Sequence, residues 1–173
     1  MARKTTPDSF RDLIAAARQH IPEVAISTDV IAGFPGETEA EFGESLEFVK
    51  EMDFAGGHAF SYSPRPGTGA ARMKEQIHPE VRKERNSLYR ALFEESANAY
   101  RRKFVGRTLP VLWESTTRLD EQGWQMEGLT GNYLRVNALT GAARWNEMDE
   151  VELIENGDGS MRGVILRMDE GKK

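Results

Sequence analysis

The chain of 173 residues contains no cysteine. This absence excludes structural disulfides, a cysteine zinc site, a thiol nucleophile and any cysteine-ligated iron–sulfur cluster held by this chain alone. No stretch approaches the roughly 18 consecutive apolar residues that a membrane span needs. The N-terminal residues also lack the apolar core of a secretion signal. We therefore expect a cytoplasmic protein without a membrane partner.

The composition is that of an ordinary globular protein, with 39% apolar and 29% charged residues, and one or two domains are expected. The net charge of −5 is unevenly distributed along the chain. Residues 1–71 carry 6 basic and 11 acidic side chains, residues 72–107 carry 10 and 5, and residues 108–173 carry 7 and 12. Because local potential steers binding partners, the basic middle segment is a candidate contact surface.

The first hundred residues alternate helix and strand signals. Thr6 and Pro7 predict a helix start, and Pro22 ends the apolar stripe that follows. The β-branched residues 24–32 predict a strand buried on both faces, which ends at a Gly-Phe-Pro-Gly turn. Residues 38–41 form a capping box that predicts the next helix.

A second strand is predicted over residues 58–62, and a long helix from Pro79 to about Lys103. This order is typical of βα units around a parallel sheet. After Gly106 the pattern changes to short runs of alternating apolar and polar residues, separated by turn residues. They are residues 108–113, 124–128, 132–136, 150–154 and 163–166. Five short strands predict a small barrel, of which the OB-type barrel is one nucleic-acid-binding form.

The sequence thus predicts an α/β part followed by an all-β part, with the boundary near residue 105. The two strands of the first part end in loops that contain glycine and proline, at residues 33–37 and 63–68. Ligands in α/β folds bind where such loops meet, at the carboxyl ends of the strands. The alternative is that these loops are only tight turns. Asp29 lies in an apolar strand, so it is expected to find a partner or to face the pocket.

These segments together resemble one family. Residues 28–38, Thr-Asp-Val-Ile-Ala-Gly-Phe-Pro-Gly-Glu-Thr, and residues 62–68, Tyr-Ser-Pro-Arg-Pro-Gly-Thr, are similar to the last two strand-end motifs of radical S-adenosylmethionine methylthiotransferases. Residues 105–109 and 127–136 resemble the TRAM domain that ends those enzymes. The resemblance covers essentially the whole chain. It implies a partial radical SAM (β/α) barrel over residues 1–104, an OB-like TRAM β-barrel over 105–168 and a tail of 169–173.

The resemblance also implies cofactors. Full-length members use S-adenosylmethionine and two [4Fe-4S] clusters, and this chain has none of the cysteines that bind them. It therefore resembles the C-terminal part of such an enzyme and is expected to be inactive alone. In the family, a radical derived from S-adenosylmethionine removes hydrogen from C2 of an adenine base. A sulfur atom and a methyl group then fill that position.

The resemblance assigns a pocket to the two strands of the α/β part. It implies that Ile31 and Gly33 pack against the adenine of S-adenosylmethionine and that Phe60 and Tyr62 border the same pocket. For Ile31 and Phe60, packing in a barrel core is the alternative. Arg65, between two prolines at a strand end, is a candidate phosphate or substrate contact, with a solvated loop arginine as the alternative.

The all-β part offers aromatic and arginine side chains for RNA. Exposed aromatics stack on unpaired bases, and arginine contacts phosphate. The candidates are Trp124, Tyr133, Arg135, Arg144 and Trp145, although one tryptophan is expected to lie in the barrel core. The acidic balance of residues 108–173 is unusual for an RNA-binding domain.

The basic long helix is a second source of positive charge for RNA, and a solvated face with local ion pairs is the alternative. Its basic residues are Arg82, Lys83, Arg85, Arg90, Arg101, Arg102 and Lys103. His58 and His78 lack ligand-spaced carboxylates, so no metal site is predicted. No catalytic dyad or triad is predicted either.

Three substrate classes compete within the family: isopentenyladenosine and threonylcarbamoyladenosine next to the tRNA anticodon, and an aspartate of a ribosomal protein. Residues 63–73 and 83–85 are most similar to the threonylcarbamoyladenosine type. A non-catalytic RNA-binding module and a protein-docking domain are the remaining alternatives. Two strands of an incomplete barrel leave an open edge, so self-association through residues 20–70 is also expected.

Overall fold

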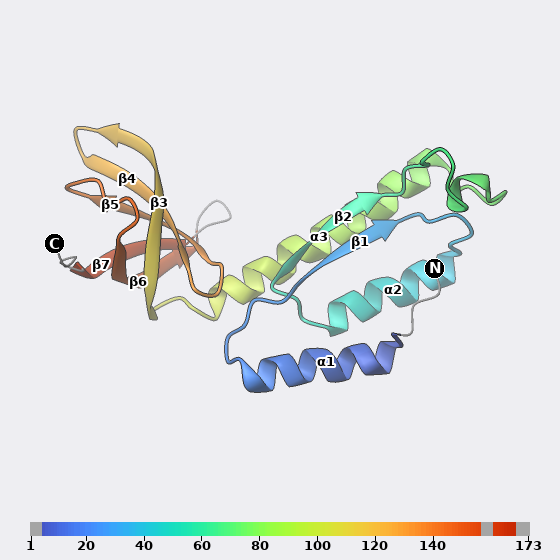
Figure 1. Cartoon of the computed structure of the whole chain (residues 1–173), viewed down its shortest axis with the longest axis horizontal. Coiled ribbons are helices and arrows are strands. Elements are labelled where there is room, and N and C mark those ends of the chain that lie inside the picture. The colour runs from blue at the N-terminus through green and yellow to red at the C-terminus, as the bar shows by residue number, and fades with distance from the viewer. Residues whose placement is uncertain (1–4, 157–160, 169–173) are drawn as a thin grey trace. The chain divides into compact units, whose positions relative to one another are not determined.

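The computed structural model describes residues 5–156 and 161–168 (Figure 1). The chain divides into two compact units, Met1–Ala97 and Asn98–Lys173. Within the described ranges, no helix is long and apolar enough to cross a membrane.

The first unit alternates helices and strands in the predicted order. Its elements are α1 (Pro7–His20), β1 (Ser27–Ala32), α2 (Glu39–Glu51), β2 (Gly56–Ser61), the short 3₁₀ helix η1 (Ala70–Arg72) and most of α3 (Pro79–Arg102). The predicted helices and both strands are confirmed, with β1 starting later than the sequence indicated.

Reciprocal capping bonds fix the starts of α1 and α2. The Thr6 hydroxyl accepts the Ser9 N–H at 3.2 Å, and the Ser9 hydroxyl accepts the Thr6 N–H at 2.9 Å. In α2 the Thr38 hydroxyl accepts the Glu41 N–H at 3.2 Å, and the Glu41 carboxylate accepts the Thr38 N–H at 2.8 Å. The hydrogen bonds from the Thr38 backbone and hydroxyl lower the pKa of Glu41. Both caps satisfy N–H groups that a helix start otherwise leaves free.

The two strands form a parallel sheet with one covered and one open face. Residues alternate between the faces, so Val30 and Ala59 pack toward the helices. Ile31 lies opposite Phe60 in the register, and both remain about half exposed, at 52% and 53%. The prediction that this strand is buried on both faces is therefore wrong, because the apolar cluster of this unit lies against only one of them. Asp29, on the open face, is solvated and needs no buried partner.

Apolar side chains of all three helices meet under the covered face of the sheet. The buried cluster comprises Ile14, Ala32, Phe42, Val49, Met52, Phe54, Tyr89 and Phe93. The Tyr89 hydroxyl donates to Ser45 Oγ at 2.8 Å, and burial raises the pKa of Tyr89. This polar atom is satisfied inside the core, as a buried hydroxyl requires.

Five strands of the second unit close into a barrel in the order β3-β4-β5-β7-β6. They are β3 (Thr108–Asp120), β4 (Gly123–Thr130), β5 (Arg135–Thr140), β6 (Met148–Asn156) and β7 (Met161–Met168). The predicted five-stranded barrel is confirmed. Trp113 and Met126 are fully buried in its core, which identifies Trp113 as the tryptophan expected there.

One predicted strand begins too early. The sequence placed a strand at residues 132–136, whereas β5 begins at Arg135. Tyr133 has a φ of 62°, a left-handed conformation that no strand tolerates. Its N–H donates to Thr130 O at 3.0 Å, which closes a turn between β4 and β5.

We expect Gly128→Ala to destabilise the barrel by about 1–3 kcal/mol, since overpacking a tight core has this cost. The added methyl group would lie 2.8 Å from Val111 Cγ1 and 2.9 Å from Trp113 Cε3. The control is Gly131→Ala, because nothing lies within 4 Å of a Cβ at that position. Urea unfolding followed by tryptophan fluorescence measures both variants, and equal midpoints would contradict the prediction.

Candidate functional site

The loop after β1 is held closed by hydrogen bonds from its own glutamate and from a later segment. Gly33 N–H donates to Glu37 Oε2 at 3.0 Å, and Gly36 N–H donates to Glu75 O at 2.8 Å. Gly33 and Gly36 have φ values of 73° and 85°, which favour glycine. The Gly-Phe-Pro-Gly segment is therefore a fixed turn whose shape depends on contacts beyond the loop itself.

Arg85 of α3 fastens this loop from inside the fold. Its Nη1 donates to the Glu37 carboxylate at 2.7 Å and to Glu37 O at 3.0 Å, while Nη2 donates to Glu39 at 2.8 Å. The guanidinium also lies 5.0 Å from the Phe42 ring centre. Burial lowers the pKa of Arg85, but the hydrogen bonds to Glu39 and Glu37 outweigh it and leave this pKa raised.

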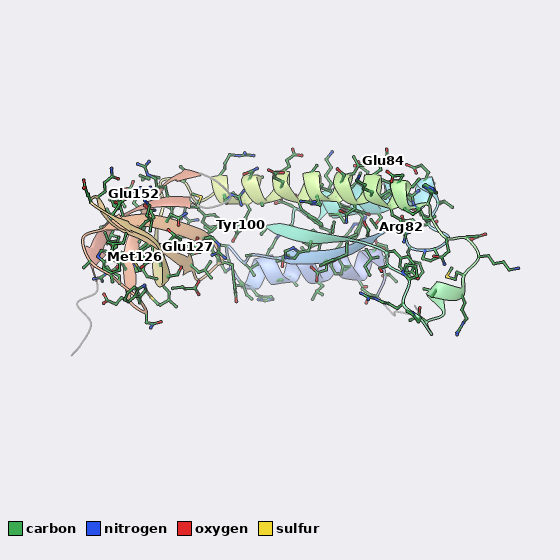
Figure 2. The ribbon with its side chains drawn as sticks, turned by 90° about the horizontal axis from the view of Figure 1, so that it is seen from above. Arg82, Glu84, Tyr100, Met126, Glu127 and Glu152 are labelled. Atoms are coloured by element: carbon green, nitrogen blue, oxygen red, sulfur yellow. The ribbon has the colours of Figure 1, made fainter. Side chains whose placement is uncertain are left out.

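Arg82, one turn earlier on α3, contacts both strand-end loops (Figure 2). Its Nη1 donates to Tyr62 O at 2.6 Å. A Cβ on Gly33 would overlap Arg82 Cγ, so the missing side chain of Gly33 makes room for the arginine stem. Tyr62 N–H in turn donates to Ala32 O at 2.9 Å, and its ring meets Phe34 edge-on at 5.4 Å. Arg82 thus ties the ends of β1 and β2 together.

The residues expected around S-adenosylmethionine fall in two places in this unit. Ile31 and Phe60 lie side by side on the open face, whereas Gly33 and Tyr62 lie beyond the strand ends. Ile31 and Phe60 are each about half exposed, and their contact with an adenine ring stays a prediction. Arg65 is exposed in the second loop, where its carbonyl accepts the Thr68 hydroxyl at 2.8 Å.

The described residues of this chain offer no site for an iron–sulfur cluster. No group of histidine, aspartate and glutamate side chains in the described part of the chain has the arrangement of a metal site, and cysteine is absent from the sequence. His58 lies on the open sheet face opposite Asp29 in the register.

The turn between β4 and β5 presents Tyr133 to solvent. Thr130 N–H donates to Leu134 O at 3.0 Å, and Leu134 N–H donates to the Thr130 hydroxyl at 2.9 Å. Asn132 Nδ2 donates to the Tyr100 hydroxyl at 3.0 Å, which joins the turn to the end of α3. The Tyr133 side chain is 79% exposed. Thr130, Asn132 and Leu134 are thus held by hydrogen bonds, while the Tyr133 ring is available for contact.

The other predicted RNA contacts are spread over the barrel. Arg135 follows Tyr133 closely, is exposed and pairs with the partly exposed Glu127, which Figure 2 labels in the barrel. Trp124 packs partly against the core at the opposite end of β4, roughly 20 Å from the turn at about 3.3 Å per residue. Its ring meets the half-exposed Trp145 edge-on at 5.5 Å.

Arg144 has an internal role. Its Nε donates to Asp149 Oδ2 at 2.6 Å and its Nη2 to Asp149 Oδ1 at 2.5 Å, while only 12% of its side chain is exposed. Asp149 is buried and also accepts the Trp113 indole N–H at 2.8 Å. This guanidinium therefore neutralises a buried carboxylate, and the predicted RNA contact of Arg144 stays a prediction.

Sequence reasoning missed the residues that hold these loops and turns. The sequence predicts Arg82 and Arg85 only as part of a basic helix face, although their spacing of three residues already places them on one side of the helix. Glu75 and Tyr100 carry no local signal, because their partners lie far away in the sequence. The exposed basic residues of α3 are Lys83, Arg90 and Arg102, with Lys103 just beyond its end.

We expect Arg85→Met to destabilise the first unit by about 2–3 kcal/mol, because it leaves the mostly buried Glu37 carboxylate without its cation. Lys83→Met, at an exposed position of the same helix, is the matched control and should change stability by less than about 0.5 kcal/mol. All three tryptophans lie in the second unit, so far-UV circular dichroism reports the helical unit. Equal unfolding midpoints for the two variants would refute this role of Arg85.

Sequence comparisons place the chain among known proteins. A tRNA-2-methylthio-N(6)-dimethylallyladenosine synthase from Erythrobacter litoralis is 38% identical over 96% of this chain and 36% of its own length. A threonylcarbamoyladenosine tRNA methylthiotransferase from Bacillus subtilis is 38% identical over 97% of this chain and 37% of its own length. No family model matches the chain. The chain spans little more than a third of these relatives. It belongs to the tRNA methylthiotransferase family and corresponds to the C-terminal part of its longer members.

Proposed function

We propose that this chain is the substrate-recognition end of a tRNA methylthiotransferase, contacting the anticodon region through its barrel and supplying one side of an S-adenosylmethionine pocket. The observation that carries the proposal is the Tyr133 ring, 79% exposed on a turn fixed by hydrogen bonds. A tyrosine held in a left-handed conformation is strained, and such strain concentrates at functional positions.

The surroundings of Tyr133 suit an unpaired base next to a phosphate. Arg135 is exposed two residues away. The end of α3 contacts the turn through Tyr100. The last two residues of α3, Arg101 and Arg102, are basic, and Lys103 and Arg107 follow the helix. This local positive charge offsets the acidic balance of the barrel, since potential near the contact matters more than total charge.

The two parallel strands are, in this proposal, the last strands of a radical SAM barrel. Ile31 and Phe60 offer an apolar surface to the adenine ring, while Arg82 and Arg85 fix the loops at its edge. S-adenosylmethionine supplies the methyl group and, after reduction by a cluster, the hydrogen-abstracting radical. Because no cysteine is present, the chain by itself should not carry out this chemistry.

Among the substrates, we favour threonylcarbamoyladenosine next to the anticodon. Support comes from residues 63–73 and from the Bacillus subtilis relative, whose name specifies that base. The Erythrobacter litoralis relative is named for dimethylallyladenosine at the same identity. Stem-loops that carry one or the other modification therefore discriminate between the two. We further propose that the chain self-associates, since the sheet in residues 20–70 has an open face among the described residues.

We expect this chain to bind a tRNA anticodon stem-loop with an affinity that falls as salt rises. Tyr133→Ala should weaken binding by about 5- to 150-fold, because stacking on one base contributes about 1–3 kcal/mol. Tyr133→Phe keeps the ring and should bind like the parent chain. Fluorescence anisotropy at two salt concentrations measures all three proteins.

The exposure of Tyr133 means that neither substitution should change the unfolding midpoint. Absence of binding at both salt concentrations would overturn the RNA-recognition role of this chain. Equal affinities of the alanine variant and the parent would overturn the role of Tyr133.

A further inference from the structure

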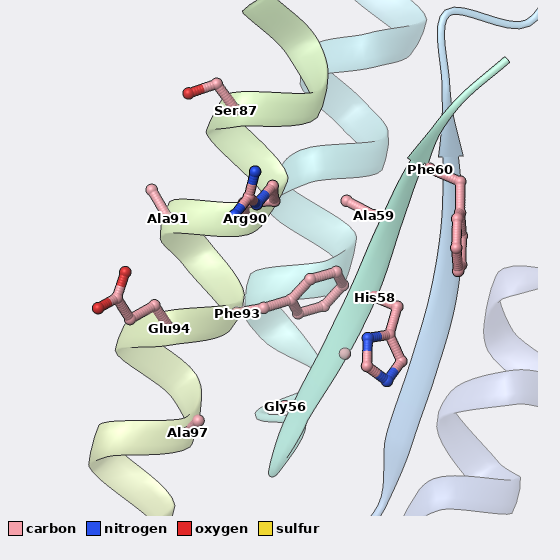
Figure 3. Close-up of a pocket in the computed structure, with 11 residues that line it drawn as sticks. Gly56, His58, Ala59, Phe60, Ser87, Arg90, Ala91, Phe93, Glu94 and Ala97 are labelled. Atoms are coloured by element: carbon pink, nitrogen blue, oxygen red, sulfur yellow. The ribbon is translucent and has the colours of Figure 1, made fainter. Parts of the chain in front are cut away.

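The outer edge of β2 borders a groove of about 580 Å³ in the first unit. Figure 3 shows α3 along one side of this groove and β2 along the other, with Phe93 reaching from the helix toward the strand. His58 and Phe60 project from the other side of β2. Among the described residues, β2 pairs only with β1, so this edge of the sheet has no neighbour.

The backbone along this edge is free to accept another strand. Tyr62 N–H donates to Ala32 O of β1. Backbone groups of a strand alternate in direction, so the even-numbered residues of β2 address β1. The N–H and C=O groups of Gly57, Ala59 and Ser61 therefore point to the open edge. An unpaired edge of this kind is a template for strand addition.

The helix wall of the groove carries one charge of each sign. Arg90 and Glu94 are one helical turn apart and exposed, and neither forms an ion pair within the described structure. Around them the wall has short side chains that allow a close approach of another helix. They are Ser87, Ala91 and Ala97. If α3 of a second copy ran antiparallel beside this wall, its Glu94 would lie opposite Arg90 of the first copy.

We propose that the groove binds the same groove of a second copy of this chain. The two β2 edges pair antiparallel into a four-stranded sheet, and the two α3 helices lie side by side. Arg90 of each copy then faces Glu94 of the partner, so the dimer holds this ion pair twice, because a twofold axis repeats every contact. The self-complementary charge pattern is what selects a second copy as the occupant. The inference rests on the self-association proposed above and is independent of RNA binding.

The test is sedimentation velocity of the 173-residue chain from low micromolar to submillimolar concentration. The parent chain should form dimers. Arg90→Glu and Glu94→Arg each place like charges opposite each other and should raise the dimer Kd by about tenfold, which is 1.4 kcal/mol. The double variant R90E/E94R exchanges the charges and should restore the parent Kd. Circular dichroism confirms that each variant is folded.

Hydrogen exchange gives a second readout. In the parent chain, the amides of Gly57, Ala59 and Ser61 should exchange more slowly as the protein concentration rises. In the Arg90→Glu variant, the exchange of the same amides should not depend on concentration. A parent chain that stays monomeric throughout overturns both the interface and self-association. A dimer whose Kd is unchanged by both single substitutions overturns this interface alone, and neither outcome bears on binding of the stem-loop.

Discussion

The pairing of Arg85 with Glu37 is the interaction on which the strand ends of the first unit depend. The Glu37 carboxylate accepts both the arginine and the Gly33 N–H, so one side chain links α3 to the turn after β1. Arg82 then couples that turn to the end of β2 through Tyr62 O. Removing the cation from this network leaves the mostly buried Glu37 carboxylate without compensation, which destabilises the fold.

The barrel uses the same principle at its turns. Asp149 is buried and holds Arg144 and the Trp113 indole, which fixes the segment that carries Trp145. Thr130 and Asn132 fix the segment that carries Tyr133. In both places a polar network inside the fold holds a turn, and an aromatic ring outside it remains exposed. A ring held in this way loses little conformational entropy on binding, so more of its stacking energy appears as affinity.

Local chemistry explains which features were predictable from the sequence. The caps at Thr6 and Thr38 and the glycine turns depend on neighbouring residues, and the structure has them where the sequence places them. The exposed face of β1 was not predictable, since apolar composition does not say which elements cover a strand. The role of Arg144 was hidden for the same reason. Its partner is five residues away, but the burial of that partner is a consequence of barrel closure.

The internal use of arginines changes what the charge distribution means. Residues 72–107 are basic by sequence, yet Arg82 and Arg85 neutralise or bridge groups within the fold. Fewer cations than the sequence suggests are thus available to phosphates. Each phosphate contact contributes to the salt dependence of binding, whereas stacking on an aromatic ring depends on salt far less. If RNA binds around Tyr133 as proposed, its affinity would come from unpaired bases more than from the backbone, because the barrel around that ring is acidic. Such a surface would favour a loop over a duplex, because only a loop offers bases that can leave their stack.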